Sequence, residues 1–296
     1  MHTDGVDVLN SFSMICNIED CSFCQGALCT KGLFQDSKEC REQRNVPGRL
    51  DVQLCSLPMF RSRDLVRVDI DSTSKGQQTK WLTKDRKWLI KERFYYQCRF
   101  WNDPLVEAIG SKVCESLHIS SVKYQLCTVD GRLASLCKME DDKFIPLKRL
   151  DKKGMLEEYS GEDRIKFVRE TLSNQIGYDA VQYLADMTLA DFIVGNEDRH
   201  CGNFGIGSRG LFPLFDFGLG LFEHDYIYSG LSLTEAIPKM NKQPFGRWDI
   251  ALDYFSKEGV LKTGTVDLSG YILPNNLASE YLRYSTKKVG VNLCGI

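Results

Sequence analysis

Hydrophobic and polar positions alternate with a period of two over much of the chain between residues 61 and 145. Alternation of this kind, interrupted by turn-forming residues, is typical of half-buried antiparallel strands. We therefore expect a β-rich region here. The expected strands are 65–70, then 81–82 and 88–91 around a turn at 84–86, then 122–129 and 132–137 around a turn at 130–131.

Apolar residues recur at helical intervals in one segment of this region and throughout the second half of the chain. Pro104 stands at a favoured first-turn position of a helix. The four-residue spacing from Leu105 to Leu117 predicts a helix with one buried stripe. After Pro146 the periodicity becomes helical, which predicts a helical region. Its expected helices are 162–175 and 179–194, both amphipathic, followed by 248–257 and 276–287.

Residues 1–60 follow neither period, because glycines and Pro47 break their short apolar pieces. We expect a Cys-rich N-terminal extension over 1–60, a β-rich lobe over 61–145 and a helical lobe over 146–296. The predicted fold class is α+β, with two lobes.

Composition narrows the classes of function. The chain has 296 residues, a formal charge of -2 and 43% hydrophobic residues, as expected of a soluble globular protein. That charge provides no overall basic field, so we expect no direct binding to nucleic acid and none to a membrane. No apolar run reaches membrane-spanning length and the first residues lack a secretory pattern, so a cytoplasmic location is expected.

Six of the twelve cysteines lie in the first 55 residues. Cys21 and Cys24 have zinc-knuckle spacing, but no second pair with this spacing follows, so a zinc site remains one alternative. A disulfide framework is less favoured without a secretory signal. Reduced cysteines in a small β-rich segment are the preferred interpretation.

The candidate chemistry lies at 196–203 and 216–218. Phosphoryl transfer by a kinase needs an Asp that orients the attacking hydroxyl, an Asn five residues later that holds magnesium, and a second Asp beyond a short hairpin. Asp198, Asn203 and Asp216 have this order, and 204–215 predicts the hairpin around a turn at 207–210. Asp, Asn and Gly are also turn formers. The three residues at this spacing nevertheless favour a phosphotransferase.

A kinase also needs a cation on the non-transferred phosphates and a carboxylate that fixes it. Lys91, at the end of an apolar strand, is the preferred candidate, with Lys80 and Lys87 as alternatives. Glu107 on the following helix is the preferred partner, with Glu115 as competitor.

The loop 72–80 offers hydroxyls, a glycine and backbone amides that could cover phosphates, although an ordinary hairpin loop has the same composition. We expect His200 to pack and orient the loop that carries Asp198. For Arg199 a local ion pair and a phosphate contact both remain open.

These residues resemble the HipA-like serine/threonine kinases, in the phosphatidylinositol 3/4-kinase-like branch of the protein-kinase fold. The resemblance runs from about Val66 to Phe222. The family's Asn-x-Asp-Arg-His-x-x-Asn motif stands at 196–203, its Gly-x-Gln-x-Lys loop at 76–80 and its strand lysine at Lys91. The chain departs from the family at His118 and over residues 1–60, which puts a toxin–antitoxin role in doubt.

The resemblance implies a bilobal protein-kinase-like fold that uses ATP and Mg²⁺. Asp198 would be the catalytic base, and Asn203 and Asp216 would be the metal ligands. ATP would be bound by Lys91, Glu107, Gly76, Gln78 and Lys80. The expected activity is transfer of the γ-phosphoryl group to Ser or Thr of an unidentified protein, with possible autophosphorylation. The alternatives are nucleotidyl transfer or lipid phosphorylation on the same fold, or a non-catalytic nucleotide-binding interaction module.

Overall fold

The structure is a computed structural model, and its described part divides into two compact units. The first comprises Met1–Leu105 and Tyr124–Met139, and the second comprises Val106–Lys123 and Glu140–Ile296. The segmentation at residues 60 and 145 stays a prediction. The structure describes residues 57–68, 78–93, 95–96, 99–100, 102–139, 143–152, 154–222, 228, 230–240, 244–271, 273 and 276–296, and the backbone of two short strands, β1 (Cys24–Gln25) and β2 (Leu28–Cys29).

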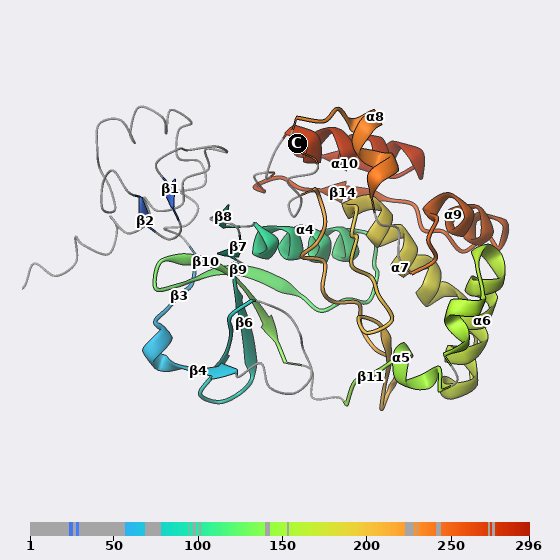
Figure 1. Cartoon of the computed structure of the whole chain (residues 1–296), viewed down its shortest axis with the longest axis horizontal. Helices are drawn as coiled ribbons and strands as arrows, with labels where there is room; N and C mark the ends of the chain where they lie inside the picture. Colours follow the sequence, from blue (N-terminus) through green and yellow to red (C-terminus); the bar gives the residue numbers. More distant parts are fainter. Residues whose placement is uncertain are drawn as a thin grey trace, which may run out of the picture. The chain divides into compact units, whose positions relative to one another are not determined.

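The first unit is built on a six-stranded sheet with the order β3-β9-β10-β6-β5-β4 (Figure 1). All neighbours pair antiparallel except β3 and β9, which are parallel. Two short strands, β7 and β8, pair separately. The bounds are β3 (Met59–Phe60), β4 (Leu65–Val68), β5 (Lys80–Thr83), β6 (Trp88–Glu92), β7 (Tyr95–Tyr96), β8 (Arg99–Phe100), β9 (Tyr124–Val129) and β10 (Arg132–Lys138), with a 3-10 turn η2 (Ser62–Asp64).

Local sequence explains the two central hairpins. Asp85 shapes the β5–β6 turn, because its carboxylate accepts hydrogen bonds from the Thr83 hydroxyl and the Lys87 amide. Asp130 and Gly131 both have positive φ angles, as tight hairpin turns require. Alternate positions on the strands then face one side and form the core, which confirms the predicted strand pattern. The core residues are Ile90, Cys127, Val129, Ala134 and Leu136.

The second unit is mainly helical, as the periodicity after Pro146 predicts. Among the described residues no helix is both long and apolar enough to cross a bilayer. Its helices are α4 (Asp103–Ser116, which begins in the first unit), α5 (Leu147–Leu150), α6 (Gly161–Ile176), α7 (Val181–Val194), α8 (Leu233–Ala236), α9 (Trp248–Lys257) and α10 (Asn276–Lys288), with 3-10 turns η3 (Met155–Glu158) and η5 (Ile237–Lys239). Its strands are β11 (Ile145–Pro146), β12 (Gly205–Gly207), β13 (Gly210–Leu211), β14 (Thr265–Asp267) and β15 (Asn292–Cys294).

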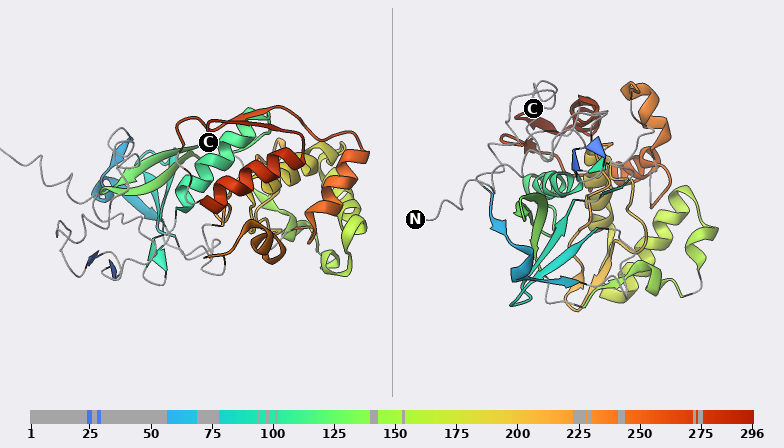
Figure 2. Two further views of the ribbon diagram at one scale, coloured as in Figure 1. Left: turned by 90° about the horizontal axis from the view of Figure 1, so that it is seen from above. Right: turned by 60° about the vertical axis from the view of Figure 1, so that its left-hand side comes forward.

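Helix α7 corrects one prediction. The sequence pattern of 179–194 predicts an amphipathic helix, but every residue from Tyr183 to Val194 is buried. Neighbouring helices cover α7 on several sides: α9 packs on it, and Phe192 meets Trp248 edge-on at 5.6 Å between ring centroids. Tyr281 of α10, red in Figure 2, donates its hydroxyl hydrogen to the Phe192 carbonyl at 2.7 Å. Helix α7 is therefore the core of the second unit, while α6 is amphipathic as predicted.

Candidate active site

Helix α7 ends where the 196–203 loop begins. Gly195 takes a φ of 62° as the C-terminal cap of α7. A Cβ at this position would lie 2.8 Å from Met240 Cε and 2.9 Å from Tyr281 Cε1. Glycine allows both the left-handed backbone conformation and the close packing against these two side chains. The loop consequently leaves the buried helix at a fixed point.

Asn196 connects the end of α7 to both candidate aspartates. Its amide Nδ2 donates to Asp191 Oδ1 at 2.8 Å and to the Asp216 carbonyl at 3.3 Å. Its Oδ1 accepts from the Asp198 backbone N–H at 3.2 Å. The asparagine side chain is fully buried. One side chain therefore sets the position of the Asp198 and Asp216 backbones.

Arg199 is the centre of a buried network behind the loop. Its Nε and Nη2 each donate to one carboxylate oxygen of Asp191 at 2.9 Å, which is a bidentate ion pair. Its Nη1 donates to the Asn203 carbonyl at 2.9 Å and also to the Phe215 carbonyl. Both charged side chains are at most 1% exposed. Of the two roles that the sequence leaves open for Arg199, the structure shows the local ion pair.

The network places Asp198, Asn203 and Asp216 together. Asn203 Nδ2 donates to the Asp198 carbonyl at 2.9 Å, and within the described residues no donor reaches Asn203 Oδ1. Burial raises the pKa of Asp198, and the nearby Asp216 carboxylate raises it further, against the opposing effects of His200 and Arg199. Two carboxylates that influence each other in this way form a site of concentrated negative charge.

Asp216 carries backbone strain. Its φ of 64° lies in the left-handed region, where a residue with a Cβ is uncommon. Conformations of this kind cost about 1–3 kcal/mol and persist where the surroundings enforce them. Here hydrogen bonds hold the backbone on both sides of the Asp216 Cα. Arg199 donates to the Phe215 carbonyl, and Asn196 donates to the Asp216 carbonyl.

The predicted hairpin between Asn203 and Asp216 is present but short. Strands β12 and β13 pair antiparallel at Ile206 and Leu211, and β11 extends this ribbon on the other side through Ile145. A Cβ at Gly205 would lie 2.1 Å from the Ile145 carbonyl oxygen, so only glycine allows this close strand approach. The ribbon brings the chain back to Asp216 beside the loop.

Phe217 links the network to helix α4. Its ring is fully buried and stacks 5.0 Å from the Arg199 guanidinium. On its other side it meets Gly110, where a Cβ would lie 2.5 Å from Phe217 Cγ. Glu107, one turn earlier on α4, is 1% exposed, whereas the competitor Glu115 is exposed and pairs with Lys112 at 3.0 Å. Of the two candidate carboxylates on α4, Glu107 is thus the buried one, and its functional role stays a prediction.

The predicted ATP lysine lies in the first unit. Lys91 is 6% exposed, and its Nζ lies 5.3 Å from the centre of the Tyr124 ring. Lys80 pairs directly with Lys91 across β5 and β6, so both lysines project from one face of the sheet. Lys87 is exposed beside the β5–β6 turn. The pairing of Lys91 with Glu107 stays a prediction.

The remaining loop residues are only partly described. Gln78 is half-buried just before β5. Gly76 and the hydroxyls at 72–74 lie outside the described residues, as do the side chains of Cys16, Cys21, Cys24 and Cys29. The zinc alternative and the phosphate-covering role of the loop therefore stay predictions.

His200 corrects a smaller expectation. It is exposed, so it does not pack as the sequence analysis expects. Its Nδ1 accepts a hydrogen bond from the Gly202 amide at 2.9 Å, so it does orient the loop.

Two functional contacts escape the sequence analysis. Asp191 is one of them, although an acidic residue in a nearly apolar helix, shortly before the loop, is a usable signal. The other is Glu197, whose Oε2 accepts from the Tyr228 hydroxyl at 2.8 Å and whose N–H donates to the Leu219 carbonyl at 3.1 Å. Glu197 thereby fastens the segment after Asp216 to the loop.

Asn203 and Asp216 are suitable ligands for magnesium. Mg²⁺ is usually held by one or two carboxylates together with phosphates and water, and not by an all-protein cage. The Asp216 carboxylate is a ligand of this kind. The Asn203 Oδ1, which accepts no hydrogen bond from the described residues, also fits this chemistry. Across the described ranges, no group of three His, Cys, Asp or Glu side chains is placed to hold a metal ion.

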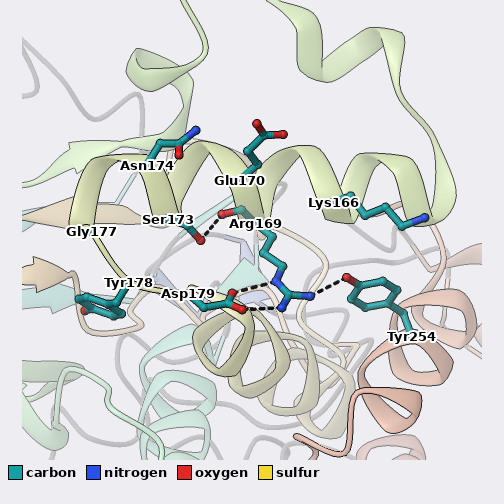
Figure 3. Close-up of a pocket in the computed structure, with 9 residues that line it drawn as sticks. All are labelled: Lys166, Arg169, Glu170, Ser173, Asn174, Gly177, Tyr178, Asp179 and Tyr254. Atoms are coloured by element: carbon teal, nitrogen blue, oxygen red, sulfur yellow. Dashed lines mark hydrogen bonds and ion pairs between the residues drawn. The ribbon is translucent and has the colours of Figure 1, made fainter.

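A separate surface hollow of about 590 Å³ lies along α6, the connection from α6 to α7 and Tyr254 of α9 (Figure 3). Arg169 points into it, but its guanidinium is engaged by Asp179 at 2.8 Å, by the Tyr254 hydroxyl at 2.9 Å and by Glu258 at 2.9 Å. The hollow shares no residue with the 196–203 loop. Its arginine joins α6 to α9 and to the connection between α6 and α7, which is a structural role.

Solved structures with similarity to the chain include three kinase-fold proteins. The proinflammatory kinase CtkA of Helicobacter pylori is 17% identical with a TM-score of 0.45, and the match covers 62% of this chain and 66% of CtkA. HipA of Shewanella oneidensis MR-1, in complex with HipB and operator DNA, is 16% identical with a TM-score of 0.38, over 76% of this chain and 57% of HipA.

The third is the phosphotransferase APH(2'')-IIa in its complex with streptomycin and ATP. It is 13% identical with a TM-score of 0.28, over 62% of this chain and 71% of APH(2'')-IIa. Structural neighbours of this chain thus include HipA, the kinase CtkA and aminoglycoside phosphotransferases. The chain spans less than two thirds of CtkA and of HipA. No protein-family model and no curated protein matches it.

Proposed function

We propose that this protein is an ATP- and Mg²⁺-dependent protein kinase that transfers the γ-phosphoryl group to Ser or Thr of a protein. The Arg199 network supports this proposal most strongly, because it holds a base candidate and two metal-ligand candidates together behind one loop. Kinase catalysis consists largely of positioning and charge stabilisation, which such a network supplies.

Each residue has a specific proposed role. Asp198 orients the acceptor hydroxyl and accepts its proton, and a raised pKa makes it a better proton acceptor than an ordinary carboxylate. Asn203 and Asp216 hold Mg²⁺, which when bound neutralises charge on the ATP phosphates. Lys91, fixed by Glu107, contacts the non-transferred phosphates. Gly76, Gln78 and Lys80 cover them.

The alternative enzymes differ from a protein kinase in the bond of ATP that breaks or in the acceptor. A nucleotidyl transferase on this fold would transfer the α-phosphate with its nucleoside, and a lipid kinase would use another acceptor. A non-catalytic nucleotide-binding module needs neither Asp198 beside Asp216 nor the strained backbone of Asp216. Both features have a free-energy cost, and phosphoryl transfer gives a reason for each.

ATP labelled separately on the α and γ phosphates tests the reaction type. The purified protein is incubated with Mg²⁺ and each label, with casein as acceptor, and protein-bound label is counted. A kinase transfers only the γ label. Transfer of the α label would establish nucleotidyl transfer, and absence of transfer to casein and to the protein itself would contradict the proposal.

Two variants separate the roles of the aspartates. Asp198→Ala should abolish transfer and retain Mg·ATP binding in calorimetry, while Asp216→Ala should lose metal-dependent binding because Asp216 would be a ligand of the Mg²⁺ that accompanies ATP. Asp163→Ala, an exposed aspartate on α6, is the control. Unchanged Mg·ATP affinity in Asp216→Ala would contradict the metal assignment.

A further inference from the structure

A cluster of exposed cations lies next to the 196–203 loop. Of the ten residues from 143 to 152, four are basic and only Asp151 is acidic. All four basic side chains are exposed, and within the described residues they have no ion-pair partner. We call these four residues the basic patch: Lys143, Lys148, Arg149 and Lys152.

The backbone fixes the basic patch against the loop. The Lys148 amide donates to the Cys201 carbonyl at 3.0 Å, and the Leu147 amide donates to the Phe204 carbonyl at 2.9 Å. These contacts flank Asn203 and start three residues after Asp198. Helix α5, which follows β11 in Figure 1, therefore begins directly on the loop and carries Lys148 and Arg149 in its last turn.

Asp151 forms no ion pair with the patch among the described residues. Its two carboxylate oxygens accept the backbone amides of Met155 and Leu156, both at 2.9 Å. The carboxylate is thus turned toward the start of η3. The chain as a whole has 38 basic and 40 acidic residues, so the patch is a local departure from a nearly neutral composition.

Acidic residues limit the size of the patch. In the sequence, three acidic residues directly precede it: Glu140, Asp141 and Asp142. The acidic residues that follow it are exposed: Glu157, Glu158, Glu162 and Asp163. A nucleic acid binds through many phosphate contacts along an extended basic surface, and an anionic bilayer would meet the acidic residues as well. A short acidic peptide segment fits four cations with an acidic border.

We propose that the basic patch binds acidic residues that flank the acceptor hydroxyl, so that the enzyme prefers Ser or Thr in acidic protein segments. This inference rests on the proposed kinase function and names its substrate class. The contacts are exposed ion pairs, so they act on acceptor binding and weaken at high ionic strength.

Binding is measured by fluorescence anisotropy with two labelled peptides, one with serine between glutamates and one with serine between glutamines. Wild type should bind the glutamate peptide more tightly, and 0.5 M NaCl should remove the difference. Lys148→Gln/Arg149→Gln should weaken its binding about two- to thirtyfold, the effect of two exposed ion pairs. Lys287→Gln/Lys288→Gln, also adjacent cations in a last helical turn, is the control and should bind as wild type.

Three outcomes would overturn the inference: equal affinity for both peptides, equal losses in both double variants, or tighter binding of a single-stranded RNA oligonucleotide or of phosphatidylserine vesicles. The γ-phosphate transfer assay with the same peptides distinguishes this failure from failure of the proposed function. Transfer without acidic preference refutes the patch alone. Glutamate-specific binding without transfer to any acceptor supports the patch and refutes the kinase.

Discussion

Replacing Arg199 by methionine tests whether the buried ion pair holds the candidate site together. Methionine retains an unbranched apolar side chain, but it leaves Asp191, 1% exposed, without its counter-charge. Removing one partner of a buried pair costs about 3–5 kcal/mol. For a protein of this size 1 kcal/mol lowers Tm by about 2–4 °C, so we expect a fall of about 6–20 °C.

A second substitution separates stability from activity. In Arg199→Met/Asp191→Asn neither charge of this pair remains, and the new amide oxygen of residue 191 can still accept from Asn196. We expect the double variant to regain part of the lost stability, measured by urea unfolding. Phosphoryl transfer should stay lost, because the Asn203 and Phe215 carbonyls still lack their common donor.

An exposed pair of the same chemistry provides the control. Arg247 and Asp249 form a side-chain ion pair with more than half of each side chain exposed. Arg247→Met should therefore cost no more than about 1 kcal/mol. The reasoning is refuted if Arg199→Met costs as little as Arg247→Met, or if the double variant regains wild-type transfer.

Three further predictions follow from the site. The pKa of Asp198 is raised on folding, so ionisation of this carboxyl group opposes folding once the pH rises above the pKa that the group has in the unfolded chain. Asp198→Asn should therefore raise Tm at pH 7. This gain in Tm should be lost as the pH falls below about 4, where the carboxyl group is protonated in both states. Gly110→Val should lower the free energy of unfolding by about 1–3 kcal/mol, because the new side chain overpacks against Phe217, and it should reduce phosphoryl transfer. Phe217→Leu should restore part of both losses. Independent effects of the two substitutions in urea unfolding would contradict the contact. We also expect the kinase to inhibit itself by phosphorylating a hydroxyl at 72–74 during incubation with Mg·ATP. The new phosphate, of charge about -1.5 to -2, would be repelled by the ATP phosphates and lower the rate of transfer. Mass spectrometry that finds no phosphate at 72–74 in an active enzyme would refute this self-inhibition.

Short-range patterns allowed much of the fold to be predicted. The hairpins around Asp85 and Asp130 and the helices α4, α6, α9 and α10 follow from periodicity and turn chemistry. Strand β3 does not, because two residues carry no period and Phe60 pairs in parallel with Val129, far along the chain. The same limit applies to the parallel pair β14 and β15.

For the site, spacing indicates which residues are the candidates for the chemistry, and their roles stay predictions. Spacing does not indicate what holds these residues in place. The order of Asp198, Asn203 and Asp216 is a local pattern. The partner of Arg199 is not, because burial decides whether an arginine contacts phosphate or a carboxylate inside the protein. Asp191 acquires its role only when α7 is enclosed on all sides, and the amphipathic pattern predicted for 179–194 missed that enclosure.

The enclosure of α7 has a consequence for hydrogen exchange. Amides in a helix with twelve consecutive buried residues exchange only when the surrounding structure opens, so α7 should belong to the slowest-exchanging part of the protein. Asp198 and Asn203 lie a few residues beyond the end of that helix. They are held to its Asp191 through hydrogen bonds of Asn196 and Arg199. The loop should therefore lose its arrangement together with the core and not by local fraying, so that activity on heating should persist until the second unit unfolds.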